Sequence, residues 1–187
     1  MKKEKTDTSN LLLSTKELPQ GWSSARISTL VHLVNGRAFK PSEWETSGLP
    51  IVRIQNLNNP EAPFNYSTNK FDEKFLIDIG TLVFAWSGTP GTSFGAHIWK
   101  RGKAWLNQHI FKMVFDENLI NKKYLRFAIN QNLNEYINNA HGGAGLAHIT
   151  KGKFDSSEIP LPPSPSSTAS SPKSKSYFPI WTPASPA

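Results

Sequence analysis

Glycine and proline divide the sequence into short runs up to about residue 120, and one long amphipathic segment follows. In that segment, residues 121–140, apolar side chains recur three and four positions apart, which is the spacing of one helix face. The earlier runs are rich in β-branched and aromatic residues and are bounded by turn residues, a pattern typical of strands. Several strands mixed with a long helix predict an α/β (α+β) fold, with a mixed β-sheet and packed helices.

The expected elements follow from the same local signals. The run Ile27–Val34 fits either a helix that stops at Gly36 or a strand, because its apolar spacing is helical but its residues are β-branched. The other expected elements are a turn at 17–22, a strand at 48–57, a buried strand at 81–86, a glycine-rich loop at 87–95, a β-hairpin with its turn at 100–103 and a strand ending near 115, a helix at 121–140, a second glycine-rich loop at 141–154 and an extended segment at 158–163.

Length and composition limit the classes of protein to consider. The 187 residues suffice for one domain with an appendage, and the net charge of +7 favours a polyanionic partner or an anionic membrane surface. The absence of cysteine excludes disulfides, Cys-ligated zinc and thiol catalysis. The three leucines at 11–13 are too few for a signal peptide, and no run approaches the ~18 apolar residues of a membrane span. We therefore expect a cytoplasmic protein without a membrane partner.

The motifs that would indicate catalysis are missing. The stretch SGTPGTSFG at 87–95 lacks the lysine of a phosphate-binding loop, and no Gly-x-Ser-x-Gly occurs. The histidines lack a metal-ligand spacing and have no neighbouring acidic cluster, so we expect no metal site. The acids and lysine of DEKFLID, at 72–78, resemble a nuclease site only loosely, because such a combination is common on solvated loops. The sequence therefore indicates a binding protein, not a self-sufficient enzyme.

Basic and amide side chains in predicted loops are the candidates for the binding surface. Arginine and lysine can pair with phosphates or guanine edges, and asparagine and glutamine with adenine edges. Each residue alone is as well explained by solvation, so the interpretation depends on the set. The candidates are Arg37, Lys40, Gln55, Ser87, Thr89, Lys100, Arg101, Lys103 and Lys151.

Six stretches between Leu18 and Pro163, in this order, resemble the target-recognition domain of a type I restriction–modification specificity subunit. They are LPQGW, GLPIVRIQNL, GTLVFAWSGTPGTSFG, WLNQHIFKMVF, NKKYLRFAINQN and GGAGLAHITKGKFDSSEIPLPP. The resemblance implies a non-catalytic subunit that binds double-stranded DNA in a sequence-specific manner through the candidate residues. It also implies methyltransferase subunits, which bind S-adenosylmethionine and methylate adenine, and restriction subunits in the larger complex. This chain itself would bind no cofactor.

Such subunits usually carry two recognition domains separated by long helices. A single domain, as here, could act as a half-subunit by forming a homodimer that reads a palindromic split site. We expect a flexible segment at 1–16, the recognition domain at 17–163 and a disordered tail at 164–187.

The tail departs from the family, in which the Pro-Leu-Pro-Pro exit is followed by a long spacer helix. Codons permitted for residues 163–169 encode Leu-Ala-Glu-Gln-His-Arg when read one base earlier. The continued reading spaces isoleucine and leucine like a heptad helix. Our hypothesis is that residues from about 164 onward are out of frame, so that the start of the spacer helix is missing or non-native. The alternative is a genuine disordered tail in which Lys173 and Lys175 contact DNA.

Two other functions remain open from the residues alone. One is the DNA-reading part of a fused methyltransferase or endonuclease. The other is a carbohydrate-binding module that uses Trp44, Trp86 and Trp99, although these side chains are better explained by packing.

Overall fold

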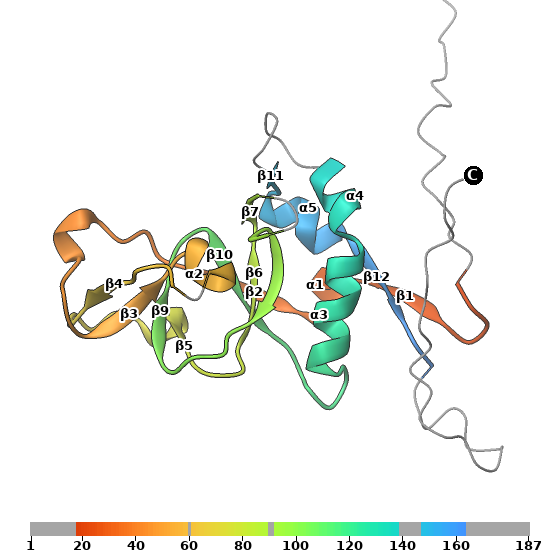
Figure 1. The fold of residues 1–187 in the computed structure, drawn as a ribbon. Coiled ribbons are helices and arrows are strands. Elements are labelled where there is room, and N and C mark those ends of the chain that lie inside the picture. The colour runs from red at the N-terminus through yellow and green to blue at the C-terminus, as the bar shows by residue number, and fades with distance from the viewer. Residues whose placement is uncertain (1–17, 60, 90–91, 139–146, 164–187) are drawn as a thin grey trace, which may run out of the picture. The chain divides into compact units, whose positions relative to one another are not determined.

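The computed structural model describes residues 18–59, 61–89, 92–138 and 147–163 (Figure 1). Its contacts divide the chain into two units, residues 24–160 and the combination of 1–23 with 161–187. In the second unit the Trp22 backbone N–H donates to Pro19 O at 3.0 Å, which closes the turn expected at 17–22. The segments at 1–17 and 164–187, including the tail on which the frame hypothesis rests, lie outside the described residues. The fold below is that of residues 24–160.

A four-stranded antiparallel sheet forms the centre of this unit. Every residue of Leu82–Ala85 is buried, which confirms the buried strand expected there and places it inside the sheet. The strand order is β2 (His32–Asn35), β10 (Ile110–Val114), β6 (Leu82–Ala85) and β8 (Gly95–Ile98).

A second four-stranded sheet lies on the side of the central sheet away from helix α3 (Figure 1). Its inner strands pair in parallel, with Ile51 opposite Trp105, and the outer pairings are antiparallel. The order is β4 (Asn65–Ser67), β3 (Leu49–Val52), β9 (Ala104–Leu106) and β5 (Leu76–Ile77). The two sheets make the protein a mixed α+β fold, as the sequence predicts.

The prediction of a β-hairpin around Lys100–Lys103 is wrong. Strand β8 pairs with β6 in the central sheet, whereas β9 pairs with β3 and β5 in the second. The physical reason is that Ala104–Leu106 is buried on both faces and bonded at both edges, so it is an inner strand with no edge left for β8. Residues 100–103 therefore carry the chain from one sheet to the other.

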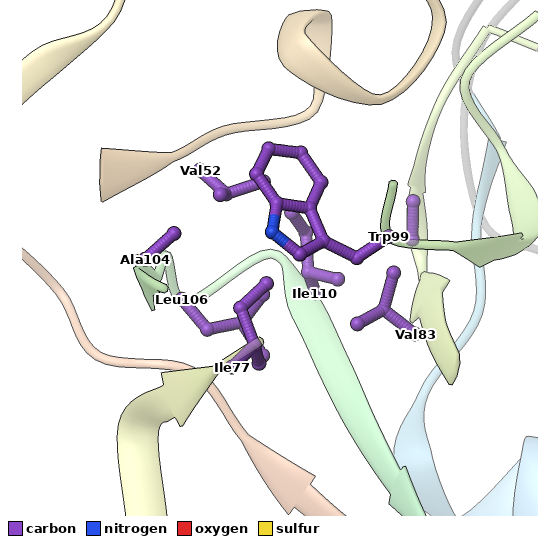
Figure 2. Close-up of a cluster of buried hydrophobic side chains, with 8 residues drawn as sticks. Val52, Ile77, Val83, Trp99, Ala104, Leu106 and Ile110 are labelled. Atoms are coloured by element: carbon purple, nitrogen blue, oxygen red, sulfur yellow. The ribbon is translucent and has the colours of Figure 1, made fainter. Parts of the chain in front are cut away.

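A hydrophobic cluster fills the space at this crossing. Trp99, directly after β8, packs with Val52 from β3 and Leu106 from β9, so residues from both sheets share one core (Figure 2). The other buried members are Ile77, Val83, Ala85, Ala104 and Ile110. This shared core fixes the position of the turn that follows Trp99.

Two expected elements change type part-way. The run from Ile27 is one helical turn, α1 (Ile27–Leu30), and then strand β2, so both interpretations hold in part. The strand expected at 48–57 ends at Val52, and helix α2 (Gln55–Asn58) follows. The buried Asn56 side chain causes this turn, since it accepts from Arg53 N at 2.9 Å and donates to the carbonyls of Ala62 and Pro63.

The helix expected at 121–140 is present but divided. It consists of α3 (Lys122–Gln131) and α4 (Leu133–Asn138), and the Asn121 side chain caps α3 by accepting from two backbone N–H groups. The Asn130 side chain bonds to both the N–H and the C=O of Ala96, which fixes α3 against β8. Asn132, at the break, donates to Glu158 O.

The prediction of a second glycine-rich loop at 141–154 is partly wrong. Residues 139–146 lie outside the described residues, but α5 (Lys151–Ser156) occupies the end of the expected loop. Thr150 caps it, and its buried Phe154 stacks on Phe84 with ring centroids 3.9 Å apart. This packing on the central sheet stabilises a helix that contains Gly152 and is only six residues long.

The remaining elements are short. The extended segment expected at 158–163 forms strand β12, which pairs with β1, and the Ser24 hydroxyl donates to the Glu158 carboxylate at 2.8 Å. Among the described residues, no helix has the length and apolar character needed to cross a membrane. The short elements are β1 (Ser23–Arg26), β7 (Ser87–Gly88), β11 (Ala147–His148), β12 (Glu158–Leu161) and the 3-10 turns η2 (Pro41–Glu43) and η3 (Glu73–Phe75).

Candidate nucleic-acid interface

The turn between β8 and β9 presents three of the predicted cations together. Lys100, Arg101 and Lys103 are exposed. The Trp99 indole N–H donates to Gly102 O at 2.8 Å, which ties the turn to the buried core. The Arg101 guanidinium lies 5.0 Å from the centroid of the Phe64 ring. The turn therefore holds three exposed cations in a fixed position, where an anionic partner could bind them.

Three other candidates are also exposed. Lys40 precedes η2, Gln55 begins α2 and Thr89 follows β7. The Thr89 carbonyl accepts from Thr92, Ser93 and Phe94 N–H groups, so its own backbone position is fixed. Whether these side chains contact DNA stays a prediction.

Arg37 already has partners within the chain. Its guanidinium donates twice to the Glu43 carboxylate and lies 4.8 Å from the Phe39 ring centroid and 4.3 Å from that of Phe71. The Arg37 hydrogen bonds, with a further one from Lys40 N, lower the pKa of Glu43 to about 2. The guanidinium therefore holds the segment between β2 and η2 in place.

The sequence predicted that Ser87 and Lys151 lie in loops, and the structure places both in regular elements. Ser87 is 8% exposed in strand β7, where it pairs with His148 of β11. Lys151 is the first residue of α5, and its ammonium group bonds to Asp155, one helical turn later, at 2.5 Å. Ser87 differs from the prediction because β7 pairs with β11, and Lys151 differs because Thr150 caps α5 directly before it.

A basic and aromatic cluster around Trp86 is brought together from distant parts of the chain. The Trp86 indole N–H donates to Gln108 O at 3.0 Å, and its ring centroid lies 5.0 Å from that of His109 and 4.6 Å from that of His148. Burial and the charges of His148 and Arg53 lower the pKa of His109. We call Arg53, Trp86, Gln108, His109 and His148 the Trp86 cluster.

Sequence reasoning missed the Trp86 cluster, because its members are separated by up to 95 residues. The local signals were the amide and histidine pair at 108–109 and Trp86, which the sequence suggested only as a carbohydrate contact or a packed residue. Within the described part of the chain, no group of three or more His, Asp or Glu side chains is placed to hold a metal ion.

The sequence matches the model of a known protein family, the type I restriction modification DNA specificity domain, over residues 19–167. The chain belongs to this family. A relative is the specificity subunit of the type I restriction enzyme EcoBI from Escherichia coli, which is 26% identical over 144 residues. That alignment covers 76% of this chain and 29% of the relative.

Solved structures of the same class share the fold of this specificity domain. The type I S subunit from M. genitalium aligns with a TM-score of 0.52 at 16% identity, covering 75% of this chain and 34% of that one. The HsdS subunit from Thermoanaerobacter tengcongensis aligns with a TM-score of 0.53 at 16% identity, covering 80% and 35%. The chain thus spans about a third of the length of the proteins that it matches. The family resemblance seen in the sequence is confirmed, and so is the fold class.

Proposed function

We propose that this specificity domain binds double-stranded DNA in a sequence-dependent manner and performs no catalysis itself. The observation that carries the proposal is the family match across residues 19–167, which includes nearly all of the described fold. The exposed turn of Lys100, Arg101 and Lys103 supports it, because cations held on a fixed turn can neutralise phosphates.

The partners follow as part of the same proposal. The domain would direct methyltransferase subunits to their adenine, with S-adenosylmethionine bound by those subunits, and restriction subunits would join the full complex. A homodimer of half-subunits would read a two-fold symmetric split site. The cytoplasmic location expected from the sequence stays a prediction.

Selection from random duplex DNA tests the proposal. The full chain, with its methyltransferase subunit, should enrich a defined set of bases. Its affinity for the selected duplex should fall steeply as salt rises, since each neutralised phosphate contributes about 0.9 to the slope of log K against log salt. The methyltransferase subunit alone is the control. Enrichment of no sequence, or affinity independent of salt, would contradict the proposal.

A further inference from the structure

The Trp86 cluster is assembled from four segments that the fold holds rigidly. Trp86 follows β6, and its backbone N–H donates to His109 O at 3.2 Å while its carbonyl accepts from Ile149 N at 3.0 Å. Asn107 N donates to Val52 O at 3.1 Å, which brings the segment before β10 beside the end of β3 and hence beside Arg53. The five side chains are all partly buried, so they form a built surface and not a set of loose side chains.

The charge of the cluster is not balanced by acids. Among the described residues, Arg53, His109 and His148 form no salt bridge with a carboxylate, and the contact of the Arg53 guanidinium is the Trp44 ring, at 5.6 Å from its centroid. The segment 139–146, which precedes β11, contains no acidic residue in its sequence. By contrast, the Arg37 and Lys151 cations have carboxylate partners. Arg53 carries a permanent positive charge, and an external anion would supply the counter-charge that no acid provides.

The hydrogen bonds of the cluster are also incomplete. The Gln108 amide N–H donates to His109 Nε2 at 3.3 Å, which makes Nδ1 the protonated nitrogen of the ring. His109 Nδ1 is buried without a hydrogen-bond partner among the described residues. A buried polar atom without a partner is uncommon and costs stability. An added acceptor that reoriented the imidazole would lower this cost.

We propose that Arg53, Gln108, His109 and His148 form, around Trp86, a subsite that holds one phosphate of the DNA backbone. The inference rests on the proposed DNA-binding function and names a contact separate from the β8–β9 turn. A phosphate is favoured over a base edge because it carries a full negative charge, which the Arg53 guanidinium can neutralise. The Arg53 guanidinium and the Gln108 amide supply hydrogen-bond donors, and the Trp86 ring fixes both histidines.

Salt-dependent binding of the full chain to the selected duplex tests the subsite. In Arg53→Gln the slope of log K against log salt should fall by about 1, so that affinity drops about fourfold less than in the wild type between 50 and 200 mM salt. The loss of affinity at low salt should be similar for the selected duplex and for a scrambled one. The control Lys123→Gln removes an exposed cation of α3 and should leave the slope unchanged. A loss confined to the selected sequence would indicate base reading and overturn the phosphate subsite, as would an unchanged slope.

A second measurement does not depend on duplex binding. Inorganic phosphate added to the full chain should shift the NMR signals of the His109 and His148 imidazoles, and Arg53→Gln should weaken these shifts. Circular dichroism confirms that the variant is folded. If the wild type fails to bind duplex DNA but these shifts occur, the DNA-binding function fails while the anion subsite stands. If phosphate leaves both imidazole signals unchanged, the subsite is wrong even where the duplex binds.

Discussion

Arg37 and Glu43 form a two-pronged salt bridge, with Nη1 to Oε2 at 2.9 Å and Nη2 to Oε1 at 2.5 Å. The guanidinium of the same arginine lies over the rings of Phe39 and Phe71. One side chain thus joins a carboxylate and two aromatic rings, and it connects the end of β2 to η2. A planar guanidinium can do this, whereas an ammonium group cannot.

Replacement of Arg37 by lysine should therefore reduce stability. We expect Arg37→Lys to lower the free energy of unfolding by about 1 kcal/mol, through loss of the ring contacts and of one prong of the salt bridge. Urea denaturation measures this change. The salt slope of DNA binding should stay the same. In Arg37→Gln, which removes the charge that lysine keeps, a reduced slope would instead make Arg37 a phosphate contact, as the sequence suggested.

Gly36 allows two backbone segments to touch. A Cβ atom at this position would lie 2.0 Å from Asn107 O and 2.5 Å from Asn107 C, and neither backbone atom can move aside easily. Gly36→Ala should lower the free energy of unfolding by about 2 kcal/mol, as overpacking of an interior does. The matched control is Gly102→Ala, because a Cβ there meets nothing within 4 Å. Equal stability of the two variants in urea denaturation would show that the crossing of β2 and β9 is looser than described.

Lys100 and Lys103 should contribute to DNA binding but not to folding. Both are exposed, and neither forms a salt bridge with any described residue. The double variant Lys100→Gln/Lys103→Gln should reduce the salt slope by about 2 and leave the thermal midpoint unchanged. Fluorescence anisotropy across a salt series gives the slope, with Lys123→Gln as the control. An unaltered slope would remove this turn from the interface.

Two histidines should make the fold sensitive to mild acid. Burial, as the largest cause, lowers the pKa of both His97 and His109, and the charge of Arg126 adds to the effect at His97. A histidine whose pKa is lower in the folded state binds its proton more readily when unfolded. The stability that it contributes is therefore complete above about pH 6.5 and is lost as pH falls below that value.

Urea denaturation at pH 7.5, 6.5 and 5.5 measures this dependence. The unfolding free energy should decrease between pH 6.5 and 5.5, and the double variant His97→Gln/His109→Gln should show a smaller decrease. The effect of Glu43 is separate, because the stability from its lowered pKa is lost only between about pH 4.5 and 2. Constant stability of the wild type down to pH 5.5 would refute the prediction.

The sequence predicted the elements whose signals are local. The buried run at Leu82–Ala85 and the helix after Asn121 could be read directly, since burial on all sides and helical periodicity are properties of neighbouring residues. Helix α5 could not, because its stability depends on the stacking of Phe154 on Phe84, seventy residues earlier. The same holds for the turn at Lys100–Lys103, whose sequence resembles a hairpin but whose strands find partners in different sheets.

The candidate site divides in the same way. Basic residues such as Lys100 and Lys103 are visible in the sequence, and exposure agrees with their expected role. The ion pair of Arg37, the burial of Ser87 and the Trp86 cluster are results of tertiary packing. Charge in a sequence therefore gives candidates, and the fold decides which charges already have partners.

The pairing of β1 with β12 has a consequence for how such domains can be combined. Because Ser24 and Glu158 are hydrogen-bonded neighbours, the chain passes into and out of residues 24–160 at one place. The chain on either side of this unit is therefore connected to it only through the paired strands β1 and β12. A segment with these two boundaries could thus be exchanged for another with the same junction, without redesign of the surrounding polypeptide.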